Sequence, residues 1–575
     1  MNRILLGILF LACSFQTITV RGQSDNPNPS DSLFALHRDI YIKFSVQSKD
    51  EIAVLTRFIS IDNVRQLEVW AFASQQGLEK LSSLGYAYET LPVPGSDLNK
   101  LELQSGVINK DKNGRTIWNS YPTYDQYIGY MTGFASTYPD ICKLDTVGTS
   151  NQNRLILALR ISKNVNIDEP EPQFLYTSSI HGDEIAGYVL MLHLIDTLLS
   201  SYGVSDRITD MIDSNVIVIN PLANPDGTFH GGNDNIGDAW RGNAYGVDLN
   251  RNFPDPNAGP HPDGNSWQTE TVAWMAYADN NRFTMSANFH GGAEVFNYPW
   301  DTWAKLHADD SWWQFVGREW ADTCHEYSPS GYFNDQDNGV TNGYAWYEIN
   351  GGRQDYMNYY QNCREVTLEI SGIKMLPVSQ LLNWWRYNYH SFFNYIEQAS
   401  YGFNGIVTDT VTNEPVAAKI LIPGHDIDNS YVFSHLPSGY YARPVDEGTF
   451  DATFSATGYY SKTIKNISIS HYTTTHLDVQ LKPLTYGIKT NEVKTALVYP
   501  NPGRGCIQIL LPDQEEGLGD IEIWNSSGKS VFKNRFSVPA GQNTLPINLE
   551  KLPSGLYMIL LYKGNTRFQD KFIIQ

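Results

Sequence analysis

Residues 173–199 read QFLYTSSIHGDEIAGYVLMLHLIDTLL, and this stretch decides the fold of the largest part of the chain. Gln173–Ser178 is a short apolar run of the kind that forms a buried strand. Ile185–Leu199 is apolar over a length that indicates a helix. His181 and Glu184 lie between the two, where a strand would lead directly into a helix. Such a junction is typical of a sheet that is covered by helices.

The same alternation extends over residues 118–400. Further strand-like and helix-like runs occur at Leu155–Ile161, Asn215–Asn220, Phe283–Phe289, Glu365–Ile370 and Leu381–Gln398. We therefore predict an α/β fold for this region, in which a mixed β-sheet is sandwiched by helices. A region of about 280 residues is near the upper size for one domain.

The segment before this region, residues 38–92, has a pattern of its own. Ile40–Val46 and Leu67–Phe72 alternate apolar and polar residues like strands, and a helix-like stretch follows each of them, at 50–58 and 75–84. This order of strand, helix, strand and helix predicts a small α/β domain. A connector rich in Pro, Gly, Asp and Lys separates it from the larger region.

The helical pattern stops after residue 401. Residues 402–484 and 496–575 each contain short strand-like runs broken by turns, such as Leu436–Tyr440 and Leu552–Tyr557. Two small all-β sandwich domains are the prediction for these segments.

The N-terminus and the composition restrict the function. Residues 1–22 place Arg3 before a short apolar run, the pattern of a secretory signal peptide. No other stretch is apolar enough to cross a membrane. The 575 residues include 41 basic and 62 acidic side chains, a net charge of −21. This balance argues against nucleic acid and against an anionic membrane surface as the main partner, because both favour clustered Lys and Arg.

The cysteines are few and widely spaced. The four that lie beyond the predicted signal peptide do not form a disulfide framework or a thiolate zinc site. Cys324 and Cys363 could pair in an oxidising compartment, and the sequence leaves this open. It also leaves the oligomeric state open.

Three residues suggest a metal site. His181 and Glu184 are three positions apart at a strand–helix junction, so both side chains can turn toward one point at the edge of the sheet. Zinc accepts imidazole nitrogen and carboxylate oxygen together. A chance H-x-x-E is expected in a chain of this length, but His290 ends another strand beside two glycines. Two near ligands and one distant ligand would leave the fourth position of zinc open for water.

Two more features belong beside such a site. Asp248–Asp255 is rich in Asp, Asn and Arg and is preceded by Arg241, so it is either a solvated loop or a site that clamps a carboxylate. Glu369 lies amid apolar residues in the predicted strand Glu365–Ile370. It is either an edge residue that faces solvent or, near a zinc ion, a candidate general base.

Together these motifs resemble the zinc metallocarboxypeptidase family, and above all its regulatory branch, typified by carboxypeptidases E, M, N and D. The resemblance spans nearly all of residues 120–400. The motifs that carry it are His181–Glu184, Asn224–Gly227, Arg241, Asp248–Asp255, Asn288–Gly292, Trp346-Tyr347, Gly351-Gly352 and Thr367–Ile370.

The resemblance implies a catalytic centre with one Zn²⁺ per chain. Its ligands would be His181, Glu184 and His290. Asp248 would orient His181. Arg241 would polarise the scissile carbonyl and stabilise the oxyanion. Glu369 would be the general base.

The resemblance also implies how substrate is held. Asn250 and Arg251 would grip the terminal carboxylate, which explains exopeptidase action, and Tyr347 would close over the bound residue. Asp301 and Gln354 would line the side-chain pocket, where an acid and an amide accept Lys or Arg in the basic-specific members.

One position departs from the family pattern. The regulatory branch usually has Gly-Gly-Met-Gln-Asp-Tyr, whereas this chain has Arg353 in place of the methionine. If Arg353 points into the pocket, it would offset Asp301 and weaken the binding of a basic side chain. If it points outward, nothing changes.

The flanking segments have resemblances of their own. Residues 38–92 are similar to the activation segment of procarboxypeptidases, and residues 402–484 resemble the transthyretin-like domain of the regulatory branch. Residues 496–575 resemble the C-terminal sorting domain of proteins exported by the type nine secretion system. This last resemblance implies an interaction with the secretion machinery and a location outside the cell or on its surface.

The sequence thus predicts a secreted zinc carboxypeptidase that acts on the C-termini of peptides or proteins. Two alternatives remain. One is a peptidase of the same fold that acts on peptidoglycan stem peptides, and the carboxylate clamp fits either substrate. The other is a non-catalytic surface binding protein, which the loss of a zinc ligand or of the base would have favoured.

Overall fold

The computed structural model describes residues 39–56, 58–92, 109–112, 116–484, 494–495, 497–510, 517–538, 544–563 and 566–575. The predicted signal peptide, residues 1–22, lies outside these residues. The chain divides into two compact units, Met1–Lys482 and Pro483–Gln575, which are described separately.

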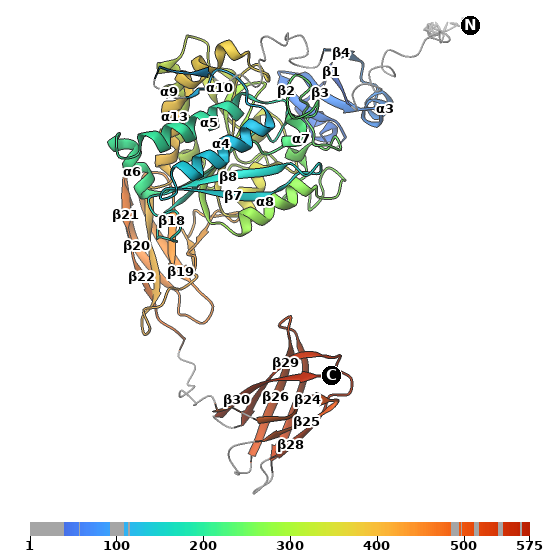
Figure 1. Ribbon diagram of the computed structural model, residues 1–575, viewed down its shortest axis with the longest axis vertical. Helices are drawn as coiled ribbons and strands as arrows, with labels where there is room; N and C mark the ends of the chain where they lie inside the picture. Colours follow the sequence, from blue (N-terminus) through green and yellow to red (C-terminus); the bar gives the residue numbers. More distant parts are fainter. Residues whose placement is uncertain are drawn as a thin grey trace, which may run out of the picture. The chain divides into compact units, whose positions relative to one another are not determined.

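The centre of the first unit is an eight-stranded mixed sheet in the order β13-β12-β14-β11-β9-β10-β8-β7 (Figure 1). Four neighbouring pairs, β9–β10, β9–β11, β11–β14 and β12–β13, are parallel, and the other three are antiparallel. The strands are β7 (Cys142–Thr149), β8 (Leu155–Ile161), β9 (Gln173–Ser178), β10 (Val216–Asn220), β11 (Phe283–His290), β12 (Glu294–Tyr298), β13 (Val340–Asn342) and β14 (Arg364–Ile370).

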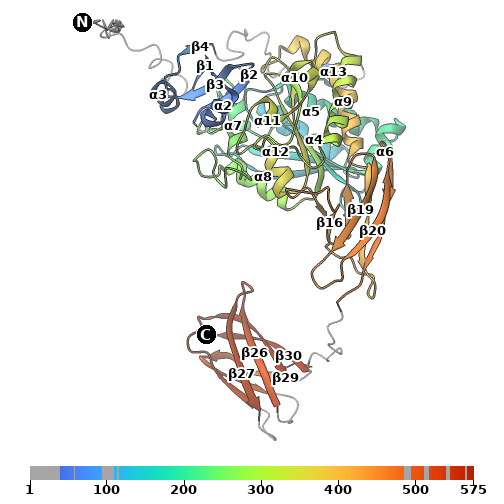
Figure 2. The same cartoon turned by 180° about the vertical axis from the view of Figure 1, so that it is seen from behind.

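Helices cover both faces of this sheet (Figures 1 and 2). Successive residues of β8 alternate between two cores: Leu157 packs with α4, α5, α9 and α13, whereas Ile156 packs with α8 and α12. The helices are α4 (Tyr124–Thr137), α5 (Ala186–Ser201), α6 (Asp206–Ser214), α7 (Pro225–Thr228), α8 (Thr269–Asp279), α9 (Asp310–Tyr327), α10 (Asp335–Gly339), α11 (Gly343–Trp346), α12 (Arg353–Tyr360) and α13 (Leu381–Gln398), with short 3-10 turns at Leu249–Arg251 and Val378–Gln380. The predicted α/β class is confirmed.

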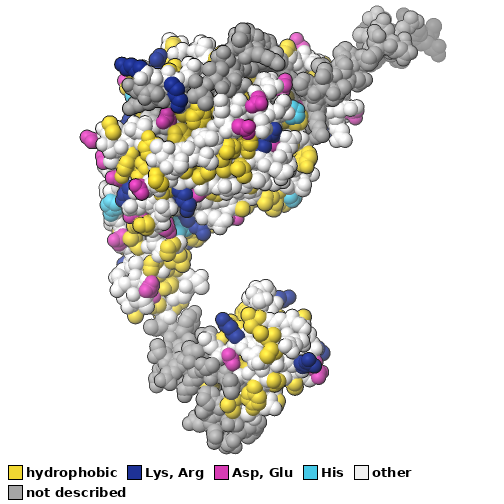
Figure 3. Space-filling model, viewed as in Figure 1, with side chains coloured by type: hydrophobic (Ala, Val, Ile, Leu, Met, Phe, Trp, Pro, Cys, Tyr) yellow, Lys and Arg dark blue, Asp and Glu magenta, His cyan; other side chains and the backbone are white. Residues whose placement is uncertain are grey.

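The helical layer that faces the viewer in Figure 1 is rich in aromatic side chains. Trp384, Trp385 and Tyr389 of α13 are only partly buried and pack against the core below them. In Figure 3, hydrophobic side chains gather on the face where Figure 1 labels α4 and α5. No helix among the described residues is both long and apolar enough to cross a lipid bilayer.

The N-terminal domain has the order β1-α2-β2-β3-α3-β4 and one four-stranded sheet, β2-β3-β1-β4. Its elements are β1 (Asp39–Ser45), α2 (Lys49–Leu55), β2 (Ser60–Arg65), β3 (Glu68–Ser74), α3 (Gln75–Ser83) and β4 (Tyr88–Thr90). The predicted order of two strands and two helices was therefore incomplete. It missed the three-residue strand β4 and also β2, which is polar at Ser60 and Asp62, so apolar alternation gave little signal for either.

The N-terminal domain does not have a separate core. Its buried residues form one cluster with Val295 of β12 and with Trp346, Tyr347 and Ile349 of the large domain. The indole nitrogen of Trp346 also donates a hydrogen bond of 3.1 Å to the carbonyl of Val64. A two-stranded hairpin, β5 (Asn109–Lys110) and β6 (Thr116–Ile117), precedes α4.

The chain leaves α13 directly into a β-domain of two sheets, β18-β15-β21 with β22, and β17-β16-β19-β20. Its strands are β15 (Gly402–Asp409), β16 (Lys419–Leu421), β17 (Val432–Phe433), β18 (Tyr440–Arg443), β19 (Gly448–Ser455), β20 (Lys462–Ile469), β21 (Thr474–His476) and β22 (Val479–Leu481). Apolar side chains of both sheets, such as Phe403 and Phe454, form the core between them.

The second unit is also all-β. Its strands are β23 (Lys494–Thr495), β24 (Leu497–Arg504), β25 (Cys506–Leu510), β26 (Gly517–Asn525), β27 (Ser530–Val538), β28 (Thr544–Asn548), β29 (Gly555–Lys563) and β30 (Thr566–Ile574). They lie in the order β27-β26-β29-β30-β24-β25-β28, and β23 pairs with β30. Ile509, Ile523 and Phe572 are among the residues of its core.

The cysteines of the described residues are all free. The suggested pair does not form, because Cys324 lies beside Ser391 of α13 whereas Cys363 lies 3.1 Å from the hydroxyl of Ser286 in β11. Burial raises the pKa of the Cys324 thiol to about 12, so this thiol is unreactive at neutral pH.

Candidate active site

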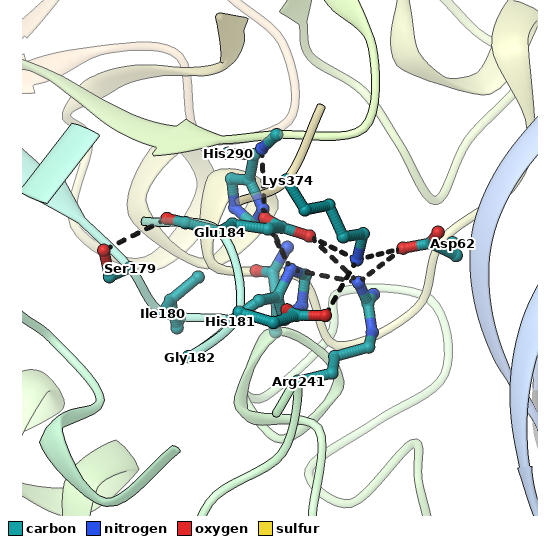
Figure 4. A network of polar contacts seen from close by, with 12 residues as sticks. Asp62, Ser179, Ile180, His181, Gly182, Glu184, Arg241, His290 and Lys374 are labelled. Atoms are coloured by element: carbon teal, nitrogen blue, oxygen red, sulfur yellow. Dashed lines mark hydrogen bonds and ion pairs between the residues drawn. The ribbon is translucent and has the colours of Figure 1, made fainter. Parts of the chain in front are cut away.

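The three predicted metal ligands lie together at one edge of the central sheet. His181 follows β9, Glu184 precedes α5, and His290 ends β11, which is the parallel neighbour of β9. Their ligand atoms all lie within 4.8 Å of one another, and the three side chains are buried (Figure 4). Glu184 Oε2 is 3.0 Å from Nδ1 of His181 and 2.8 Å from Nδ1 of His290.

The other nitrogen of each ring is held by a partner that orients it. His181 Nε2 lies 3.0 Å from Oδ1 of Asp248, and His290 Nε2 lies 2.6 Å from Oδ1 of Asn288. Both Nδ1 atoms are therefore left to face the same point. Burial lowers the pKa of His290 to about 4, which keeps its ring in the neutral form that binds metal. Two imidazoles and a carboxylate with oriented outer partners fit a zinc site.

The loop that carries His181 is braced by the Asn224–Gly227 motif. The side chain of Asn224 donates to the carbonyls of Ile180 and Gly242 and accepts from the backbone nitrogen of Gly227. The two segments approach so closely that a Cβ atom on Gly182 would lie 2.3 Å from the carbonyl carbon of Gly227. Glycine is thus required here for packing, and the motif positions the metal loop.

Neighbouring groups keep Glu184 and Asp248 ionised. Burial alone would raise the pKa of Glu184, but the contact with His181 and the positive charge of Lys374 hold it well below its usual range. Burial opposes ionisation of Asp248 too, yet Arg241 and His181 hold its pKa well below the usual value. Arg241 lies 3.0 Å from Asp248 and 3.3 Å from Glu184.

Glu369 lies opposite the metal ligand His290, in register on the neighbouring strand β14. Its Oε2 atom is buried and has no hydrogen-bond partner among the described residues. Burial, together with the negative charge of Glu184, raises the pKa of Glu369 well above its usual value. A carboxyl group with a free oxygen and a raised proton affinity is suited to accept a proton from water.

The predicted carboxylate clamp lies in the 3-10 turn Leu249–Arg251. Asp248 caps this turn by accepting from the backbone nitrogen of Asn250 at 2.9 Å, so one carboxylate organises both the clamp and His181. The Asn250 side chain accepts from the backbone nitrogen of Arg353 at 2.9 Å. Tyr347 is buried, and burial raises the pKa of its hydroxyl, so it remains protonated.

Asp301 and Gln354 also come together. Asp301 Oδ1 accepts from Nδ2 of Asn297 at 3.0 Å and from Nε2 of Gln354 at 3.1 Å. A Cβ atom on Gly343 would overlap Asp301 Oδ1, so only glycine can pack against this carboxylate. No ion pair involves Asp301 among the described residues, and burial raises its pKa to about 7. The carboxyl group is therefore buried without an ion-pair partner, and the nearby charge of Arg251 offsets only part of the rise in its pKa.

Arg353 takes neither of the two orientations considered from the sequence. Its guanidinium is buried, contacts the hydroxyl of Thr177, lies 3.2 Å from Glu365 and stacks on Trp274 with 4.9 Å to the ring centroid. No hydrogen bond or ion pair joins it to Asp301 among the described residues, and the side chain does not reach solvent. The positive charge of Arg353 is thus neutralised by Glu365 and does not oppose Asp301.

Strand β2 of the N-terminal domain lies across the site. The Ser60 hydroxyl donates to Asp248 and accepts from Nε of Arg241. The Ile61 carbonyl accepts from Nη2 of Arg241 at 3.3 Å and from Nη2 of Arg251 at 3.2 Å. Asp62 pairs with Arg241 at 3.3 Å and with Lys374 (Figure 4). The N-terminal domain therefore occupies groups that the resemblance assigns to substrate.

Sequence reasoning missed several of these residues. Lys374 lies 3.0 Å from Glu184, and a lysine five residues after the candidate base was the only signal for it. Asp183 lies beside Glu184 in the sequence and 3.4 Å from Lys374. Ser60 and Asp62 carried no signal, because their role depends on how two domains dock.

Comparisons with known proteins agree with this geometry. A model described as zinc carboxypeptidase matches residues 127–391. The catalytic chain of carboxypeptidase N from Mus musculus is 31% identical over 434 residues, which is 66% of this chain and 89% of that protein. The chain belongs to the zinc carboxypeptidase family. Zinc is the metal of this family, and His181, Glu184 and His290 form the matching site.

Further relatives of the zinc carboxypeptidase extend the comparison. Carboxypeptidase D from Homo sapiens is 33% identical over 359 residues, 59% of this chain, and the chain spans about a quarter of the length of that protein (25%). The crystal structure of carboxypeptidase A from Helicoverpa armigera aligns with a TM-score of 0.51 and 19% identity, over 63% of this chain and 97% of that one. It shares the fold.

The C-terminal segment of the zinc carboxypeptidase has a match of its own. Residues 497–575 match a model described as a secretion system C-terminal sorting domain. This domain implies export from the cell or display at its surface.

Proposed function

We propose that this zinc carboxypeptidase is a secreted exopeptidase that removes the C-terminal residue of peptides or proteins and prefers Lys or Arg. The observation that carries the proposal is the convergence of the zinc site, Glu369 and the clamp turn Leu249–Arg251 at one edge of the sheet. A site for a free carboxylate next to a hydrolytic centre restricts cleavage to chain ends.

Each group has a distinct task in hydrolysis. Zinc, when bound, polarises water and the scissile carbonyl. Glu369 takes a proton from the attacking water and passes it to the departing amine nitrogen. The guanidinium of Arg241 donates to the carbonyl oxygen as negative charge develops on it. Asn250 and Arg251 bind the terminal carboxylate, and Tyr347 covers the bound residue.

The preference for a basic side chain is supported by Asp301. This carboxylate is buried, takes hydrogen bonds from two amides and lacks a cation of its own. A substrate ammonium or guanidinium would supply the missing charge. Arg353 is paired with Glu365 and leaves Asp301 unopposed.

We further propose that the full chain is latent until the N-terminal domain moves. Ser60, Ile61 and Asp62 occupy Arg241 and Arg251, which a substrate needs. The sorting domain at residues 497–575 would direct the protein through the secretion machinery.

The test of the catalytic role is Glu369→Gln, which keeps the shape of the side chain but cannot accept a proton. The change is made in full-length protein that also carries Ser60→Ala and Asp62→Ala, which weaken the cover over the site. Turnover of a peptide with a C-terminal Lys should then fall by roughly 10² or more, while metal analysis still finds one zinc per chain. Near-normal turnover would remove Glu369 from the mechanism. If protein freed of zinc turned over the peptide as fast as zinc-loaded protein, a metalloenzyme would be excluded. If the protein released residues from peptidoglycan stem peptides but not from the Lys-ended peptide, the peptidoglycan alternative would be favoured.

A further inference from the structure

The carboxylate of Asp62 lies between two cations of the catalytic domain. It pairs with Arg241 at 3.3 Å and with Lys374, whose ammonium group is also 3.0 Å from Glu184 and 3.4 Å from Asp183 (Figure 4). The side chain of Lys374 is 2% exposed, so this positive charge faces the interior of the site rather than solvent. The mechanism described above gives Lys374 no task.

The position of Asp62 along the covering strand indicates which part of a substrate would replace it. The carbonyl of the preceding residue, Ile61, accepts hydrogen bonds from Arg241 and Arg251. Arg251 belongs to the clamp for the terminal carboxylate. One residue further along β2, the Asp62 side chain reaches Lys374, next to the metal ligand Glu184. Strand β2 thus places the Ile61 carbonyl at the clamp residue Arg251 and the Asp62 carboxylate at Lys374, which also contacts the metal ligand Glu184.

When β2 leaves the site, Lys374 and Arg241 lose this carboxylate together. Lys374 keeps its contacts with Asp183 and Glu184, and Arg241 keeps those with Glu184 and Asp248. The place between the two cations that Asp62 filled is then left without an anion, and burial of the two positive charges favours another anion there. The clamp already holds the terminal carboxylate of the substrate at Arg251, on the other side of the scissile bond. The group that can reach Lys374 is a side chain of the residue before that bond.

We propose that Lys374 and Arg241 form a subsite for an acidic side chain, so that the enzyme prefers Asp or Glu as the penultimate residue of its substrate. This inference rests on the proposed exopeptidase function and is independent of which C-terminal residue is preferred. Asp62 then acts as a tethered ligand of the subsite.

The first test measures the penultimate preference directly. Zinc-loaded full-length protein with Asp62→Ala, which vacates the subsite, is given peptides that differ only in a penultimate Glu, Gln or Lys. The Glu peptide should have a kcat/KM about five- to tenfold above the Gln peptide, as expected for one charge-assisted contact. Adding Lys374→Met should abolish the ratio, whereas adding Lys49→Met, which alters a contact of the N-terminal domain with Ala345 outside the subsite, should not. A ratio near one, or a ratio that survives Lys374→Met, overturns the proposal even if Lys-ended peptides are cleaved well.

The second test needs no turnover, because the tethered ligand reports on the subsite. Hydrogen exchange of the β2 amides is compared for Asp62 and Asp62→Asn, each with Lys374 and with Lys374→Met. Asp62→Asn should speed exchange about tenfold when Lys374 is present and less than twofold when it is replaced. Equal effects in both backgrounds would show that Lys374 does not recognise the carboxylate, and the subsite would be refuted.

Discussion

In the first unit, the N-terminal domain and the β-domain both contact the large α/β domain of residues 118–400. The two sets of contacts differ in kind. The N-terminal domain contacts it through Arg241, Asp248 and Lys374, which surround the metal site. The β-domain of residues 402–482 contacts it through Asp309, which precedes α9 and lies apart from the predicted site residues. The first interface competes with substrate, and the second does not.

The contact at Asp309 is saturated. Its carboxylate accepts from Arg443 of the β-domain at 2.9 and 3.0 Å, from Arg364 at 2.9 Å and from His425 at 2.8 Å. Burial opposes ionisation, yet Arg443 and Arg364 hold the pKa of Asp309 well below its usual value. Asp309, His425 and Asp426 are spaced like metal ligands. The two arginines already supply the positive charge, so we interpret the cluster as structural.

This difference shows that buried ion pairs between domains can either fix a domain in place, as at Asp309, or cover a site reversibly, as at Asp62. The charges of the β-domain interface pair with one another, and among the described residues these pairs include none of the predicted substrate-binding residues. The N-terminal domain pairs with Arg241 and Arg251, which a substrate would also bind on the proposed mechanism. A substrate could therefore replace it. We therefore expect the β-domain to stay attached during catalysis.

The largest effect should come from breaking the permanent interface. Arg443→Ala leaves Asp309 and Asp426 buried with one cation fewer, which should lower the free energy of unfolding of the first unit by about 3–5 kcal/mol. Lys305→Ala is the matched control, because Lys305 pairs with Asp428 across the same interface but is 45% exposed. It should cost less than about 1 kcal/mol. Chemical denaturation measures both, and equal losses would contradict the distinction.

A smaller effect should separate the paired Asp309 from the unpaired Asp301. Burial raises the pKa of Asp301 to about 7, so its ionised, cation-binding form decreases as the pH falls through 7. The ratio of kcat/KM for Lys-ended over Leu-ended peptides should therefore fall about tenfold from pH 8 to pH 6. Initial rates of the zinc-loaded protein with Ser60→Ala and Asp62→Ala, in which the cover over the site is weakened, measure it. A flat ratio that also survives Asp301→Asn would remove Asp301 from the pocket.

The smallest effect is expected at Arg353. Because its guanidinium is ion-paired with Glu365 and lies over the ring of Trp274, Arg353→Met should leave the Lys-to-Leu ratio within about twofold. The variant would still be less stable, since Glu365 loses its cation. A clear gain in the preference for Lys would mean that Arg353 does act on the pocket.

Local sequence patterns predicted much of this molecule. The strands Leu155–Ile161 and Gln173–Ser178 and the helix Leu381–Gln398 lie at the predicted residues, because long apolar runs dominate their environment. The residues that converge on the zinc site were found from polar side chains at strand ends, such as His181 and His290. These signals lie in short stretches of sequence, so they can be detected without knowledge of tertiary contacts.

The rest depended on contacts between distant segments. Strand β2 was missed because its polar residues Ser60 and Asp62 bind active-site residues of the neighbouring domain. They therefore do not alternate with apolar residues as in a strand with one face in solvent. The orientation of Arg353 depends on Glu365 and Trp274, which reach it from a different strand and helix. Neither contact leaves a pattern in the local sequence.

The central claim is that β2 stands in the place of substrate over a zinc-dependent site. It is tested most directly by the turnover of one C-terminal Lys peptide by zinc-loaded full-length protein with and without the double change Ser60→Ala and Asp62→Ala. Loss of these contacts to Arg241, Asp248 and Lys374 should raise kcat/KM by about tenfold or more, while zinc stays at one per chain. Wild-type protein that is as active as the variant, at equal zinc content, would contradict the claim.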